Sequence, residues 1–359
     1  MRKRFLSDLK GTEKLAKTIY NEDGRVLLNP GIVLTNNYIS KMDERGVNIV
    51  YVEDEISEGV EFEDYLSDKI RQKCKKDIRE SINKYLQTGK EDYDTLIECS
   101  QIILDDIMSN KGVILNMDDS RAKNEGLVPH IINVTAIVAI VGKKMGYNVM
   151  KLKDIVTGAI LHDVGKIAML RDKNLTLNKI NLIEEKTMNE HPKRGYEMLN
   201  KLWSFSSVSK IMILMHHENS DGSGYPMAMK KKDIHEGARL LRICDAFDNM
   251  MIGNSESKKP IPFNQIIDYL KFMDKYFDQE IVSILEKVIP PYPSGTVVEL
   301  STEERAVIYK QNLIDLKYPI VRAFCDKNNK YYKQSKEIDL NLNKDIKIKK
   351  VLEKVLEKV

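Results

Sequence analysis

Apolar residues recur at helical spacing through the middle of this 359-residue chain. Between residues 65 and 108 they fall three or four positions apart, which predicts amphipathic helices with a stop near Gly89. The same spacing predicts further helices over residues 131–145, 152–161, 208–215 and 238–251. The pattern therefore indicates a mainly α protein with an all-α core.

The two ends of the chain carry a different pattern. From residue 15 to residue 52, short apolar runs alternate with turn residues, which indicates a small unit that contains β-strands. After Pro290, β-branched residues around Pro and Gly predict a short β appendix near residues 290–330. Residues 346–359 place valines and leucines at helical spacing, which indicates an amphipathic segment.

These patterns divide the chain into four predicted segments. The amphipathic residues 346–359 either pack on their own chain, which we favour, or pair with a second copy in a homodimer. The segments are a small N-terminal α/β or β unit over residues 1–60, a helical connector over 61–115, a helical domain with its β appendix over 116–330, and a C-terminal tail or helix over 331–359.

The composition is that of a globular protein, because 42% of the residues are apolar and 31% are charged. The net charge of +3 gives no overall field that would attract nucleic acid, so we expect no nucleic-acid partner. The basic start lacks the apolar stretch of a leader, and residues 131–141 are too short for a membrane helix. We therefore expect a cytoplasmic protein without a membrane span. The four cysteines lack paired spacing, so we expect them to be free thiols.

All six histidines lie between residues 130 and 235, mostly where predicted helices begin or end. Two pairs of candidate ligands are adjacent in the chain, and one aspartate interrupts an otherwise apolar helical stretch. The residues concerned are His130, His162, Asp163, His191, His216, His217, His235 and Asp245.

Clustered imidazoles with interspersed carboxylates suit a pair of divalent metal ions. Two ions about 3.5–4 Å apart need several neutral imidazoles and a carboxylate that bridges them. Asp163 can bridge, because its two oxygens can face two ions while the adjacent imidazole binds one of them. Taken singly, each residue also fits a structural role, as a histidine at a helix end or a hydrogen-bonded buried aspartate. The whole set favours metal, with iron or manganese preferred and zinc, nickel and cobalt as alternatives.

Three strings of the sequence place histidines, aspartates and glycines in a specific order. The strings are His162-Asp163-Val164-Gly165-Lys166, His191-Pro192-Lys193-Arg194-Gly195 and His216-His217-Glu218-Asn219-Ser220-Asp221-Gly222-Ser223-Gly224-Tyr225-Pro226. They resemble the HD-GYP group of the HD metal-dependent phosphohydrolases. The resemblance covers roughly half of the chain and implies an HD-type helical core. It also implies a phosphodiesterase that hydrolyses cyclic di-GMP to linear pGpG, GMP or both.

The resemblance also implies roles for single residues. The group's metal ligands would fall on seven candidate ligands, namely His130, His162, Asp163, His191, His216, His217 and Asp245, whereas His235 has no counterpart in the motif. The seven would bind two divalent ions, and the catalytic residues would be Asp163 as the bridge and Lys166 as a cation. Lys166, Lys259 and Arg194 are expected to contact the substrate. A loop at the mouth of the site, where a diguanylate cyclase (GGDEF) partner could dock, would be formed by Gly222, Gly224, Tyr225 and Pro226.

The chain departs from the group's pattern in two places. Gly126 stands where some members have a glutamate that adds a third ion, so we expect two ions. Lys259-Pro260-Ile261-Pro262 replaces an Arg-Pro-Tyr segment that grips the substrate. The alternatives are a catalytically weak cyclic-dinucleotide receptor, a phosphodiesterase that prefers cyclic GMP-AMP, another hydrolase of the wider superfamily, or a helical protein without a site.

Overall fold

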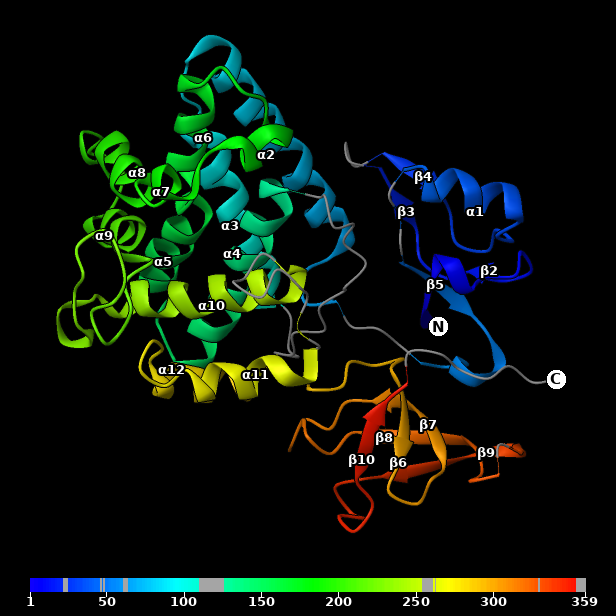
Figure 1. Ribbon diagram of the computed structural model, residues 1–359. Helices are drawn as coiled ribbons and strands as arrows, with labels where there is room; N and C mark the ends of the chain where they lie inside the picture. Colours follow the sequence, from blue (N-terminus) through cyan, green and yellow to red (C-terminus); the bar gives the residue numbers. More distant parts are fainter. Residues whose placement is uncertain are drawn as a thin grey trace. The chain divides into compact units, whose positions relative to one another are not determined.

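The computed structural model describes residues 1–21, 25–45, 47, 49–60, 64–109, 126–253, 261, 263–328 and 330–352. The described residues fall into two compact units. One unit is helical and contains residues 65–109 and 126–288, whereas the other contains residues of 1–64 and 289–352 and carries the strands (Figure 1).

The core of the helical unit is α4 (Leu127–Lys144), in which every residue from Leu127 to Gly142 is buried. A helix that is apolar on all sides needs neighbours on all sides, and α4 contacts five other helices. By length and composition α4 could cross a membrane, but 89% of this stretch is buried inside the unit, as in a core helix.

The helices predicted over residues 131–145, 152–161, 208–215 and 238–251 are present as α4, α5 (Val149–Leu161), α9 (Ser207–Met215) and α10 (Glu236–Ile252), so the predicted all-α core is confirmed. The short helices around them were not predicted, because their few apolar residues give no long periodic stretch. The helices of this unit besides α4 are α2 (Asp68–Thr88), α3 (Tyr93–Ser109), α5 (Val149–Leu161), α6 (Val164–Asp172), α7 (Glu185–Met188), α8 (His191–Asn200), α9 (Ser207–Met215), α10 (Glu236–Ile252), α11 (Phe263–Phe272) and α12 (Gln279–Glu286), with 3-10 turns η3 (Leu177–Leu182) and η4 (Lys231–Asp233).

The prediction that residues 61–115 form a separate helical connector is wrong. Its helices α2 and α3 pack on α4, α5 and α6 and belong to the helical unit. Ile103 and Leu104 of α3 are fully buried, and the Tyr65 hydroxyl donates a 2.8 Å hydrogen bond to Oδ1 of Asn133 in α4. The apolar stripe that marked these helices therefore faces the common core.

The second unit contains the predicted N-terminal strands and the C-terminal β appendix. The C-terminal strands form one antiparallel sheet in the order β10-β6-β7-β8-β9, and β1, β5 and β2 form a separate sheet. The elements are β1 (Arg2–Phe5), η1 (Leu6–Asp8), β2 (Lys14–Leu15), β3 (Ile19–Tyr20), β4 (Val26–Leu28), α1 (Asn36–Asp43), β5 (Ile49–Glu53), η2 (Glu55–Ser57), β6 (Val297–Leu300), β7 (Arg305–Lys310), β8 (Ile320–Cys325), β9 (Tyr331–Asp339) and β10 (Ile348–Val351).

The predicted tail or helix over residues 331–359 is wrong for residues 331–352, which extend the sheet beyond residue 330 as β9 and β10. Ile348 pairs with Leu300 and Val351 with Val298, so partners about 50 residues earlier in the chain hold β10 extended. Ile346 and Ile348 both pack against the buried cluster of this sheet. The end of the predicted amphipathic segment, residues 353–359, lies outside the described residues.

Candidate metal centre

Helix ends carry six of the seven candidate ligands, and the seventh, Asp245, lies within a helix. A helix end reverses the chain and leaves the last carbonyl groups without helical partners, so a side chain there can turn inward and hydrogen-bond them. The ligands come from the first turn of α4 (His130), the α5–α6 junction (His162, Asp163), the start of α8 (His191), the end of α9 (His216, His217) and the middle of α10 (Asp245).

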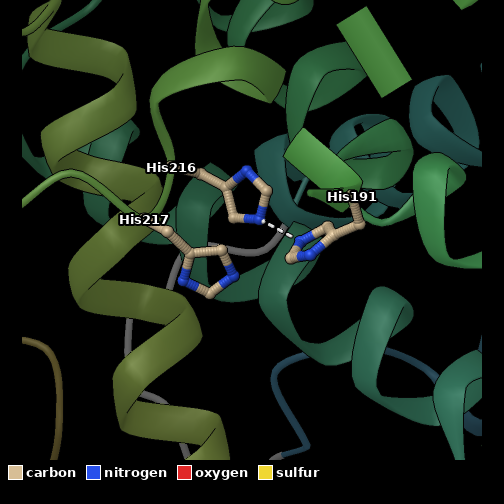
Figure 2. Close-up of side chains that lie close together, drawn as sticks. All are labelled: His191, His216 and His217. Carbon is tan, nitrogen blue, oxygen red and sulfur yellow. Dashed lines mark hydrogen bonds between the residues drawn. The ribbon is translucent and has the colours of Figure 1, made fainter. Parts of the chain in front are cut away.

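The side chains meet as two groups, and in each group the possible ligand atoms lie within 4.8 Å of one another. The three-histidine group consists of His191, His216 and His217. Figure 2 shows that His216 and His217 approach from one side and that His191 faces them from the other. The aspartate group consists of His130, His162 and Asp245.

Asp163 lies between the two groups and is completely buried. Its Oδ1 is 3.2 Å from Nε2 of His191, in the three-histidine group. Its Oδ2 is 3.4 Å from Nε2 of His162, in the aspartate group. One carboxylate oxygen therefore faces each group.

Backbone carbonyls fix the orientation of three imidazoles. Nδ1 of each ring lies 2.6–2.8 Å from the carbonyl oxygen three residues earlier, so Nδ1 carries the hydrogen and donates. The neutral ring then presents the lone pair of Nε2 to the centre of the site, as a metal ligand requires. The three pairs are His162 with Ala159, His191 with Met188, and His216 with Ile213.

The carboxylate of Asp248 fixes the orientation of the His130 imidazole. Nδ1 of His130 donates to Oδ2 of Asp248 at 2.7 Å, and Asp248 is completely buried. Asn249 in turn donates from Nδ2 to Oδ1 of Asp245 at 2.8 Å and so orients that ligand. Sequence reasoning missed both supporting residues. The available signal was the spacing of Asp248, one helical turn after Asp245 in an apolar helix.

The residues fit divalent metal ions. Among the described residues, Nε2 of His162 and Oδ1 of Asp163 are buried without a hydrogen-bond partner. The Nε2 atoms of His191 and His216 lie 3.0 Å apart (Figure 2), although both carry lone pairs when Nδ1 donates. Imidazoles whose Nε2 lone pairs converge in this way could bind one ion together. A bound cation therefore accounts for a contact that is otherwise repulsive.

The protonation states also suit metal. Burial lowers the pKa of His191, and it lowers the pKa values of His216 and His217 much further, so these rings are neutral. Burial alone would raise the pKa values of Asp163 and Asp245, but neighbouring histidines, and Lys166 for Asp163, hold both well below the usual range. Neutral imidazoles and ionised carboxylates are the forms that bind metal.

His130 differs from the other histidines. Burial lowers its pKa, but the carboxylates of Asp245 and Asp248 outweigh burial and raise the pKa to about 10. In the metal-free protein His130 is thus positively charged at neutral pH. An ion that binds there must displace its proton.

Lys166 reaches the centre from the first turn of α6. Its Nζ lies 2.8 Å from Oδ2 of Asp163, and its side chain is 17% exposed. Gly165 beside it allows α6 and α8 to meet closely, because a Cβ at Gly165 would lie 2.0 Å from the carbonyl oxygen of His191. This close approach keeps His191 next to Asp163.

We predict that Gly165→Ala destabilises the metal-free protein. The added methyl group forces α6 and α8 apart, and such overpacking costs about 1–3 kcal/mol. Thermal unfolding in the presence of a chelator measures the loss, and a melting temperature equal to that of the wild type would contradict the close contact.

The loop after His217 is tightly held. Glu218 is buried and accepts hydrogen bonds from the backbone N–H groups of Met227, at 2.7 Å, and Met229, at 2.9 Å. Gly224 tolerates no side chain, because a Cβ would lie 2.3 Å from the backbone nitrogen of Asn219. The ring of Tyr225 stacks on His217, with ring centroids 4.7 Å apart and an interplanar angle of 20°. Sequence reasoning placed this loop at the site and missed Glu218.

Arg194 and His235 do not join the candidate ligands. Arg194 is ion-paired with Asp172, and both side chains are about half exposed. Lys259 lies outside the described residues. His235 precedes α10, and its Nδ1 accepts a hydrogen bond from the backbone N–H of Gly237 at 3.0 Å. Lys166 is therefore the one predicted substrate contact that the described structure places at the centre.

Comparison with known proteins assigns the family. An HD domain model matches residues 103–281, a range that contains all seven candidate ligands. A cyclic di-GMP phosphodiesterase of Pseudomonas aeruginosa is 23% identical over 234 residues, 65% of this chain and 56% of that protein. A 3'3'-cGAMP-specific phosphodiesterase of Vibrio cholerae is 27% identical over 248 residues, 68% of this chain and 44% of that protein.

The chain thus spans about half the length of these curated relatives. A solved HDG"Y"P protein of Bdellovibrio bacteriovorus superposes with a TM-score of 0.44 at 15% identity, over 79% of this chain and 97% of that one. The matched HD domain and its relatives bear out the resemblance of the three sequence strings. Residues 103–281 of this chain thus belong to the HD domain family, and the three sequence strings and the relatives support the HD-GYP group within it.

Proposed function

We propose that this chain is a metal-dependent phosphodiesterase that opens a cyclic dinucleotide. The observation that carries the proposal is the position of Asp163, whose two buried oxygens face two separate groups of ligand atoms. A carboxylate with this placement suits two ions that share one bridging ligand. The names of the relatives, which are phosphodiesterases of cyclic dinucleotides, support the same reaction class.

Two bound divalent ions would supply a water that loses its proton near neutral pH and would neutralise the phosphate oxygens. The chain itself fixes the ligands, because hydrogen bonds to Nδ1 keep four imidazoles in one orientation. Lys166 holds a positive charge beside Asp163, where it would stabilise the negative charge that develops on the phosphate. Catalysis then requires no nucleophilic side chain.

The proposed substrate is cyclic di-GMP, with cyclic GMP-AMP as the second candidate. Relatives named for each substrate match this chain at similar identity. The proposed product is the linear dinucleotide, followed by the mononucleotide when the second ester is also cut. The second candidate function is a catalytically weak receptor for the cyclic dinucleotide. The group's Arg-Pro-Tyr segment is replaced here by a segment that starts at Lys259, which keeps one positive charge but lacks the forked guanidinium of arginine.

The test is anaerobic purification with metal analysis, followed by turnover of both cyclic dinucleotides. The wild type should contain metal and cut at least one of them, and His162→Ala/Asp163→Ala should cut neither. Asp154→Asn is the matched control, since Asp154 lies on α5, which leads to His162, but outside the two ligand groups. Metal and nucleotide bound by the wild type without turnover would instead favour the receptor.

We also propose that the loop of Gly222, Gly224, Tyr225 and Pro226 helps the protein to meet a GGDEF-domain partner. The ring of Tyr225 is turned to His217, whereas the neighbouring Met227 is 51% exposed. Met227 is therefore the apolar side chain that this loop offers to a partner. Equal binding of a cyclase domain by the wild type and by Met227→Glu would count against this role.

A further inference from the structure

We propose that Tyr225 positions His217 and thereby controls whether the three-histidine group keeps its metal ion. This inference rests on the two-ion part of the proposed function. It gives the tyrosine of the loop a task inside the metal centre, in addition to any contact with substrate or partner.

The first observation is that the five histidines among the candidate ligands are not held in the same way. A hydrogen bond to Nδ1 holds four of the rings, through a carboxylate for His130 and through backbone carbonyls for His162, His191 and His216. Within the described parts of the chain, neither ring nitrogen of His217 has such a bond. Instead, the ring of Tyr225 stacks on the imidazole of His217. His217 is thus the one ligand whose ring orientation depends on stacking.

The second observation is that Tyr225 is itself fixed relative to His217. Its backbone N–H donates to the carbonyl oxygen of His217 at 3.2 Å. On the far side of the loop, Glu218 holds the backbone of Met227 and Met229. The loop therefore folds back to the end of α9, and the Tyr225 ring stacks on the imidazole of His217. A tyrosine held in this way can restrain rotation of the His217 ring.

The third observation concerns charge. The three-histidine group shares one carboxylate, Asp163, with its neighbour and has no other carboxylate in the set, whereas the aspartate group also contains Asp245. Binding of the ion in the three-histidine group therefore depends more on the geometry of neutral ligands than binding of the ion in the aspartate group does. Loss of a residue that orients a metal ligand weakens metal binding by about 10- to 100-fold. We therefore expect this ion to be lost first when the stacking is removed.

The test compares three substitutions of Tyr225 by metal content after dialysis against a weak chelator. Tyr225→Phe keeps the ring and loses only the hydroxyl, so it should retain two ions per chain like the wild type. Tyr225→Ala removes the ring and should retain one. Tyr225→Leu fills the loop without a flat ring and should also retain one, which separates the loss of stacking from collapse of the loop.

Double variants identify which ion is lost. Tyr225→Ala/His217→Ala should retain one ion, like Tyr225→Ala alone, and Tyr225→Ala/Asp245→Ala should retain none. Two ions in both Tyr225→Ala and Tyr225→Leu would overturn the inference, as would the loss of one ion in Tyr225→Phe. A wild type with fewer than two ions would instead refute the two-ion function on which the inference rests.

Discussion

Asp163→Asn should remove both metal ions and with them all measurable turnover. Asparagine keeps the shape of the side chain, but it replaces one anionic oxygen with an NH₂ group that donates and cannot bind metal. Because each oxygen of Asp163 faces a different ligand group, a single substitution affects both sites. It also removes the negative charge that pairs with Lys166. The loss should exceed the roughly 100-fold effect of losing a residue that only orients a ligand.

Metal content and turnover of cyclic di-GMP are measured on the same preparation of Asp163→Asn. Asp154→Asn provides the control for the chemical change, because it makes the same substitution outside the ligand groups. The bridging position of Asp163 would be contradicted if the variant kept either ion at the affinity of the wild type.

Asp248→Ala should weaken the ion of the aspartate group by about 10- to 100-fold and leave the three-histidine group loaded. The substitution removes the acceptor for Nδ1 of His130, so the ring loses its fixed orientation. It also removes one of the two carboxylates that raise the pKa of His130 to about 10. The pKa of His130 in the metal-free protein should therefore fall.

Two measurements check this prediction, namely metal affinity by titration and the His130 pKa by NMR. Asp248→Asn should fall between the wild type and Asp248→Ala, since its amide oxygen still accepts the hydrogen bond but carries no charge. Glu236→Gln on the same helix is a suitable control, because Glu236 pairs with Lys151 on the partly exposed side of the protein. If Asp248→Ala binds two ions as tightly as the wild type and the pKa of His130 is unchanged, Asp248 has no role in the centre.

The helical core was predictable because its pattern is local. α4, α5, α9 and α10 each carry enough apolar residues to show a helical period. Strand β10 was not predictable in this way, because its partner is residues 298–300 and no local pattern reveals such a pairing. The assignment of α2 and α3 to the core failed for a similar reason, since spacing shows that a helix has an apolar face but not which surface covers it.

The clustering of the candidate ligands was predictable because histidines are rare in this chain and adjacent His-Asp and His-His pairs stand out. The residues that orient the ligands were missed because they have no such mark. Asp248 looks like any acidic residue on a helix until its burial and its contact with His130 are seen. Arg194 was expected at the substrate, but Asp172, 22 residues earlier in the chain, pairs with it instead.

The most direct test of the central claim is the metal content of the wild type beside His217→Ala and Asp245→Ala. Each variant removes one ligand from one group and leaves the other group complete. The account predicts two ions per chain in the wild type and one in each variant, with no further loss in a weak chelator. A wild type that binds a single ion, and loses it in both variants, would contradict two sites on opposite sides of Asp163.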